Sequence, residues 1–146
     1  MTPVAEYRFN IPRFATFYLG LSIGLPVLIY LIRQYLGFDL SSGGISLIPI
    51  MLTTLNEGAR FVRATGRRPD NREAWKMAGL FALFGVMLSM LLAAVVLVVA
   101  PALLGDLSHL AVSFIALMVA VMAIVYVLVA RVFFALGARS EVKRLP

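Results

Sequence analysis

A row of polar residues recurs at three- and four-residue spacing within residues 45–65, a stretch that is otherwise largely apolar. This spacing puts the row on one face of a helix. Its members are Ser46, Pro49, Thr53, Asn56, Glu57 and Arg60. We name the last four of them, Thr53, Asn56, Glu57 and Arg60, the polar face. Its carboxylate could carry a proton or a cation across a membrane, or it could pair with a cation and hold helices together.

The expected depth of Glu57 in the membrane makes it important to decide between ion transport and a structural ion pair. Glu57 lies twelve residues after Ile45, which is about 18 Å along a helix. It should therefore lie roughly 10 Å inside the inner boundary of a hydrocarbon core about 30 Å thick. Arg60 one turn later could pair with it locally, with Asn56 as an amide partner, to give a structural polar lock. Proton or cation coupling and docking of a partner subunit are the alternatives.

The composition predicts that the polar face belongs to a membrane protein. The 146 residues are 62% hydrophobic and 14% charged, whereas soluble domains are roughly one quarter charged. Spanning helices need about 20 apolar residues, and the sequence predicts helices at residues 14–36, 45–65, 71–100 and 109–136. Asp70 and Glu73 are spaced as a capping box at the start of the third helix. Short connections favour antiparallel neighbours, so we expect residues 1–146 to form one all-α, four-helix up-down membrane bundle.

The basic residues predict the orientation of this bundle. Of 13 lysines and arginines, all but Arg33 lie in three polar segments at alternate ends of the apolar stretches. Basic segments stay in the cytoplasm, so both termini and the connection at residues 66–70 should be cytoplasmic. If residues 45–65 did not span, six basic residues from Arg60 to Lys76 would break this rule, so we expect the second helix to cross the membrane.

The same charges indicate partners. Basic residues that flank apolar spans fit anionic lipid headgroups or an acidic partner protein, and they lack the soluble fold that nucleic-acid binding requires. The candidate lipid or partner contacts are Arg63, Arg67, Arg68, Arg72, Lys76, Arg139, Lys143 and Arg144.

Small residues at four-residue spacing predict where helices pack. Lipid tails are as apolar as leucine, so helices in a membrane associate where small side chains allow close approach. The candidate packing residues are Gly20, Gly24, Gly85, Ser89, Ala93, Ala116 and Ala120. Such faces could join helices within one chain, join copies of the chain, or dock on a larger membrane complex.

No arrangement typical of catalysis is evident in the sequence. The chain has no cysteine and one histidine, His109, so neither a metal site nor a haem site is indicated. A nucleophile with its base and a phosphate-binding loop are also missing. We therefore expect no enzyme activity, no cofactor and no metal, and we assign His109 a capping role at the start of the fourth helix.

Residues 42–79 resemble a family of small, uncharacterised bacterial inner-membrane proteins with four predicted spans. The shared features are the S-G-x-x-x-x-P start of the second helix, the N-E-G-A-R-F segment, and the G-R-x-P-x-x-x-E approach to the third helix. The resemblance implies a helical bundle in a bacterial inner membrane, and it brings no established activity.

Two functional hypotheses follow. The first is a non-enzymatic accessory or structural subunit, or a homo-oligomeric bundle, that works by contact through its small-residue faces. The alternative is a proton-coupled transporter of small solutes that uses Glu57 as the coupling carboxylate. A third, weaker hypothesis is a protein that handles lipids or cofactors.

The predicted orientation can be tested by thiol labelling, because the chain contains no cysteine of its own. A cysteine in place of Ser140 should resist an impermeant thiol reagent in intact cells, and one in place of Ser42 should react. Permeabilised cells serve as the control, in which both should react. Labelling of the Ser140 position in intact cells would contradict the orientation.

Overall fold

The computed structural model describes residues 7–37, 45–99 and 112–144 of the chain. These residues form helices and no β-strand, which confirms the all-α class. The helices are α1 (Ile11–Leu36), the short 3₁₀ helix η1 (Ile45–Leu47), α2 (Ile48–Thr65), α3 (Asn71–Val99) and α5 (Val112–Val142). His109 and most of the connections predicted at residues 37–44 and 101–108 lie outside the described residues. The role assigned to His109 therefore stays a prediction.

α1 begins earlier than predicted, and this places Arg13 inside the helix. Asn10 caps the helix, its side-chain oxygen accepting from the backbone N–H of Arg13 at 3.0 Å, and Pro12 occupies the first turn. Both features are typical helix starts. The helix therefore begins at Ile11 instead of residue 14, and Arg13 belongs to its first turn instead of a polar tail.

Three helices are long and apolar enough to cross a membrane. They cover Ile11–Tyr35, Asn71–Val99 and Val112–Val142, with 25, 29 and 31 residues. The most apolar 18-residue stretches of these helices are only 6%, 11% and 6% buried within the chain. Apolar surface that is exposed on this scale is a mark of contact with lipid or protein. These features indicate a membrane protein. α2 is less apolar and is not among these three helices.

The least apolar helix is also the most buried. α2 contacts each of the other three long helices, and half of its 18 residues are buried, including Thr53, Thr54 and Glu57. In a bilayer, polar side chains are costly against lipid and are therefore placed against protein. The apolar helices α1, α3 and α5 thus cover a polar helix.

Two glycines let α2 and α5 meet backbone to backbone. A Cβ atom on Gly58 would lie 2.1 Å from the Phe134 carbonyl oxygen, and one on Gly137 would lie 2.0 Å from the Leu55 carbonyl oxygen. Real Cβ atoms do not come so close to backbone atoms, so both positions require glycine. Close approach of this kind is how small residues join membrane helices.

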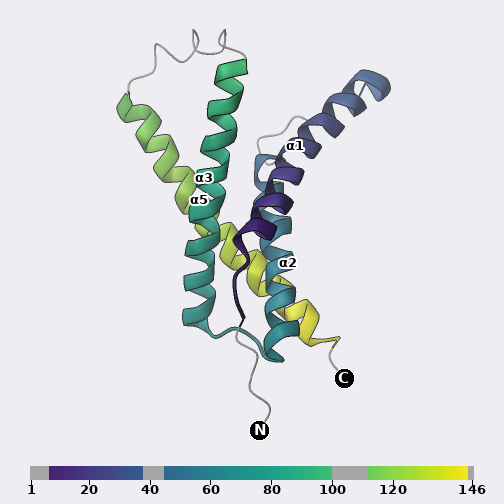
Figure 1. Cartoon of the computed structure of the whole chain (residues 1–146), viewed down its shortest axis with the longest axis vertical. Coiled ribbons are helices and arrows are strands. Elements are labelled where there is room, and N and C mark those ends of the chain that lie inside the picture. Colours follow the sequence, from purple (N-terminus) through teal and green to yellow (C-terminus); the bar gives the residue numbers. More distant parts are fainter. Residues whose placement is uncertain (1–6, 38–44, 100–111, 145–146) are drawn as a thin grey trace.

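The packed core occupies one end of the molecule. Figure 1 shows that the segment before α1, the connection from α2 to α3 and the C-terminal end of α5 lie at the same end, which we name the inner end. Stacked and edge-on aromatic rings fill the interior there, with Phe14 and Phe81 parallel at 5.4 Å and Phe81 and Phe134 at 5.5 Å. Toward the opposite, outer end the helices α1, α3 and α5 diverge (Figure 1).

Alanine substitutions can test the contact between α2 and α5. Gly58→Ala should lower the free energy of unfolding by about 1–3 kcal/mol because the added methyl group overpacks the crossing. Gly79→Ala is the matched control, since a Cβ there meets nothing within 4 Å; it should be neutral or stabilise by up to about 1 kcal/mol. Unfolding by sodium dodecyl sulfate in mixed micelles measures both, and equal effects would contradict the close contact.

Candidate functional site

The polar face centres on a buried, fully engaged carboxylate. Glu57 is 1% exposed. One guanidinium nitrogen of Arg13, Nη2, donates to both Glu57 carboxylate oxygens at 3.0 Å, and the Tyr7 hydroxyl donates to Oε2. Hydrogen bonds to a charged group are stronger than neutral ones, and a buried carboxylate needs such partners. The three side chains therefore tie the N-terminal segment and α1 to α2.

The partner of Glu57 differs from the local one that the sequence suggested. Arg60 follows Glu57 by one turn, yet it forms no ion pair within the described residues, and its buried Nε has no hydrogen-bond partner there. Arg13 pairs with Glu57 in place of Arg60, because α1 begins earlier than predicted and the first turn of α1 lies against α2. The lock therefore joins segments 44 residues apart, instead of neighbours on one helix.

The threonine hydroxyls near Glu57 are satisfied locally. The Thr53 hydroxyl donates to the Pro49 carbonyl oxygen at 2.6 Å, and the adjacent Thr54 hydroxyl donates to the Ile50 carbonyl oxygen at 2.6 Å. Such bonds to a carbonyl one turn earlier hide a hydroxyl from its surroundings. Asn56 is half-buried. Within the described residues, the polar face thus offers two charged groups, the paired Glu57 and the unpaired Arg60.

Tyr7 is held as a neutral hydrogen-bond donor. Its ring packs on Phe61 with centroids 5.2 Å apart. Burial, and then the hydrogen bond to the Glu57 carboxylate, raise the pKa of Tyr7 well above its usual value near 10, because both disfavour a second negative charge. Tyr7 therefore stays a neutral hydrogen-bond donor throughout the physiological pH range.

A second polar cluster joins three helices nearer the middle of the molecule. The Tyr18 hydroxyl lies 2.7 Å from the Ser89 hydroxyl and 3.1 Å from the Tyr126 hydroxyl, linking α1, α3 and α5. Gly85, one turn before Ser89, lets α3 approach Tyr126, since a Cβ there would lie 3.2 Å from its ring. Of the candidate packing residues, Gly85 and Ser89 therefore lie at contacts within the chain.

The other candidate packing residues face outward. A Cβ on Gly20 or Gly24 would meet nothing within 4 Å, and Ala93, Ala116 and Ala120 are exposed. In sequence they follow Tyr18 in α1, follow Gly85 in α3 or precede Tyr126 in α5. Within the described residues, no helix of this chain covers these five positions.

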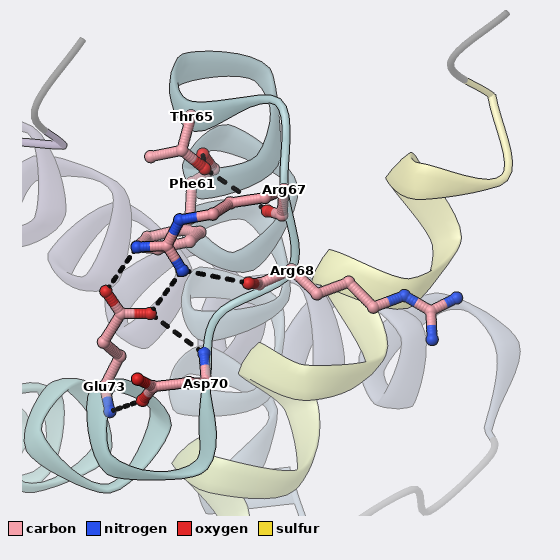
Figure 2. Close-up of polar contacts among 6 residues, drawn as sticks. All are labelled: Phe61, Thr65, Arg67, Arg68, Asp70 and Glu73. Carbon is pink, nitrogen blue, oxygen red and sulfur yellow. Dashed lines mark hydrogen bonds and ion pairs between the residues drawn. The ribbon is translucent and has the colours of Figure 1, made fainter. Parts of the chain in front are cut away.

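The connection between α2 and α3 is organised by Arg67. Figure 2 shows its guanidinium group beside the Phe61 ring and reaching Glu73, with two bonds of 2.8 and 2.6 Å. The Glu73 N–H donates to Asp70 Oδ1 at 2.7 Å, and the Asp70 N–H donates to Glu73 Oε2 at 2.9 Å. The predicted capping box is confirmed. The hydrogen bond to Glu73 raises the pKa of Arg67 further, so this candidate contact has a structural role.

The remaining basic candidates divide into one that is paired and several that are open. Arg63 donates from Nε to Glu141 Oε1 at 2.6 Å and joins α2 to α5. The others are exposed, and they are Arg68, Arg72, Lys76, Arg139, Lys143 and Arg144. Exposed cations at the inner end are free to meet headgroups or an acidic partner.

Comparison of the chain with protein-family models, with curated proteins and with solved structures found no match. The resemblance of residues 42–79 to small four-span bacterial proteins therefore stays a prediction. Among the described residues, no three histidine, cysteine, aspartate or glutamate side chains are grouped so as to hold a metal ion. The functional argument consequently depends on the geometry of the chain itself.

Sequence reasoning missed four residues that organise the site. Arg13 counted only as one of the basic residues that predict orientation, Tyr7 was not a candidate, and Gly58 and Gly137 were not among the packing candidates. The Asn10–Pro12 helix start was an available signal for placing Arg13 inside a helix. A glycine inside the predicted helix 45–65 was an available signal for Gly58, but Gly137 follows residue 136, where the fourth helix was predicted to end, and α5 continues to Val142. The Gly20 and Gly24 pair drew attention to α1 instead.

A double-mutant cycle can test the lock at Glu57. Arg13→Gln should lower the free energy of unfolding by about 3 kcal/mol, because it leaves a buried carboxylate without its cation. Arg13→Gln combined with Glu57→Gln should cost less than Arg13→Gln alone, since no buried charge remains. Arg63→Gln, which breaks an exposed ion pair, is the control and should have little effect. Additive effects of the two substitutions would rule out the coupling.

Proposed function

We propose that this chain is a small, non-enzymatic, multi-pass inner-membrane protein of bacteria that works by contact between helices. Its partner is a second copy of the chain or a larger membrane complex in which it is an accessory subunit. One observation carries the proposal: burial within the chain is confined to the inner part of each apolar helix. Beyond Tyr18 in α1, beyond Gly85 in α3 and before Tyr126 in α5, no described residue is buried.

The residues exposed there suit protein contact as well as lipid contact. Thr16, Gly20 and Gly24 are exposed and follow one another at four-residue spacing along α1, which permits close approach of another helix. Bulky apolar side chains lie beside this row, with Ile23 55% and Val27 53% exposed. Ridges of large side chains next to a groove of small ones are what helix packing requires.

A cavity between the diverging helices supports the same proposal. It has a volume of about 430 Å³ and is lined by side chains of all four long helices, among them Ser22, Pro26, Pro49, Ser89 and Tyr126. The hydroxyl groups of Tyr18, Ser89 and Tyr126 in its wall already bond one another, so the cavity offers packing space between helices. A side chain from a partner helix would fill this space.

Four crossings of the membrane, with both ends in the cytoplasm, complete the proposal. η1 and α2 together are roughly 33 Å long at the rises of 3₁₀ and α helices, which suffices for a hydrocarbon core of about 30 Å. The segment before α1, the connection after α2 and the end of α5 share the inner end (Figure 1). Every basic residue of the described chain except Arg33 belongs to segments near that end. This arrangement supports a cytoplasmic inner end.

The alternative, proton-coupled transport through Glu57, has less support from the geometry. A coupling carboxylate must exchange a proton with water or substrate, whereas both Glu57 oxygens accept from Arg13 and one also accepts from Tyr7. The two functions separate in proteoliposomes. Transport predicts a substrate-driven proton flux that Glu57→Gln abolishes, while contact predicts no such flux.

Cross-linking in native membranes tests the contact function. A cysteine in place of Gly24 should form disulfide-linked dimers or a covalent product with a partner, because α1 presents this face outward. Gly20→Leu should then reduce that product at least several-fold by blocking close approach. Gly79→Leu, at another open glycine, is the matched control and should leave the product unchanged. A monomer of the chain alone, in membranes and after mild solubilisation, would refute the proposal.

A further inference from the structure

Four arginines surround one cavity at the inner end of the molecule. The cavity has a volume of about 450 Å³ and lies between the segment before α1 and the inner half of α2. Its lining residues are Tyr7, Arg8, Arg13, Arg60, Arg63 and Ala64. Guanidinium groups present planar sets of donors that match the oxygens of phosphate and carboxylate groups. We name this feature the arginine cavity.

The arginine cavity keeps an excess of positive charge after its ion pairs are formed. Arg13 pairs with Glu57 and Arg63 pairs with Glu141. No carboxylate of the described residues pairs with Arg8 or Arg60, so two of the four charges are uncompensated there. Like charges gathered around one cavity repel one another and attract an anion.

Arg60 provides a second and independent observation. It is half-buried, and its buried Nε–H has no acceptor within the described part of the chain. A buried donor without an acceptor, on a charged group, is costly to the folded state. An anion beside the guanidinium group of Arg60 would offset part of this cost through its charge.

A second cavity at the inner end shows what distinguishes the first. It has a volume of about 400 Å³ and is also lined by three arginines, Arg68, Arg131 and Arg139, but Asp70 lines it too. Arg131 is engaged there, since it lies 4.1 Å above the Trp75 ring and donates to Asn71 at 2.8 Å. That cavity therefore has a carboxylate in its wall, which the arginine cavity does not have among its lining residues.

We propose that the arginine cavity binds the phosphate group of an anionic ligand, held mainly by Arg8 and Arg60. The first turn of α1 and the inner half of α2 bound the cavity, so it lies at the depth of the cytoplasmic headgroups in the orientation proposed above, on which this inference rests. An anionic phospholipid is the source within reach at that depth. Soluble phosphate carries the same chemistry and is distinguished by the experiment.

The test measures lipid binding by native mass spectrometry of the full chain in a mild non-ionic detergent. Dioleoyl phosphatidylglycerol is titrated against dioleoyl phosphatidylcholine, which has the same tails and no net charge. The wild-type chain should bind the anionic lipid more tightly. Arg60→Gln and Arg8→Gln should each weaken that binding about tenfold, the value of one charge-assisted hydrogen bond. Arg139→Gln removes the same charge at the other cavity and should change binding less than twofold.

Two further measurements complete the test. The midpoint of thermal unfolding, which should be within a few degrees of wild type for Arg8→Gln, shows that this variant folds, because Arg8 precedes the first helix. Inorganic phosphate, added at constant ionic strength with sodium chloride as the reference, shows whether soluble phosphate competes. Competition at millimolar concentrations supports a phosphate site with a soluble ligand, and its absence, with selective lipid binding, supports a headgroup site.

Three results would overturn the inference: equal binding of the two lipids by the wild type, unchanged binding in both Arg8→Gln and Arg60→Gln, or equal losses in Arg60→Gln and Arg139→Gln. The last would mean that overall charge, and not this cavity, attracts the anion. These results are separate from those on oligomers. A monomer that still binds the anionic lipid through Arg60 would refute only the contact function, and a cross-linked complex without selective lipid binding would refute only the phosphate site.

Discussion

The burial of one carboxylate constrains the rest of this structure. Glu57 is 1% exposed on the most enclosed helix of the chain, and a carboxylate removed from water must be paired or it strongly opposes folding. Its cation comes from the first turn of α1, and its neutral donor comes from the segment before α1. The N-terminal segment is thereby held against α2, and the Phe61 ring then packs on Tyr7. An N-terminal segment that composition would assign to a solvated tail becomes part of the folded core.

Close contact between α2 and α5 makes that burial possible. Gly58 follows Glu57 directly, and its missing side chain lets the Phe134 carbonyl group approach the α2 backbone. Because α2 approaches the α5 backbone at Gly58, the neighbouring residues of α2 lie against the other helices. Polar α2 is consequently covered by α5 and by α1, while the apolar surfaces of α1, α3 and α5 face outward. This inversion relative to soluble bundles follows from the high cost of polar groups in hydrocarbon.

The sequence was a good guide wherever the relevant interactions are local. The all-α class, the apolar length of α1, α3 and α5, and the Asp70–Glu73 capping box depend on composition and on residues a few positions apart, and each of these was predicted. The pairing of Glu57 was not, because Arg13 lies 44 residues away and nothing in one sequence shows that the two meet. A nearby cation, Arg60, was the reasonable local partner. Small-residue patterns likewise identified faces that permit contact, but whether a face meets this chain or another one depends on where the helices diverge.

The positions of the ion pairs and aromatic contacts between segments indicate which motions the molecule can make. At the inner end, Glu57 joins α1 to α2, Arg63 joins α2 to α5, and Arg67 joins the α2–α3 connection to α3, while stacked rings fill the space between them. Alternating access would have to separate helices at this end in turn with the outer end, breaking a buried ion pair and an aromatic core together. The outer parts of α1, α3 and α5 hold no such ties among the described residues. Change in this molecule is therefore easiest at the outer end, where the proposed partner helix would bind without disturbing the lock at Glu57. This asymmetry supports the proposed contact function over transport.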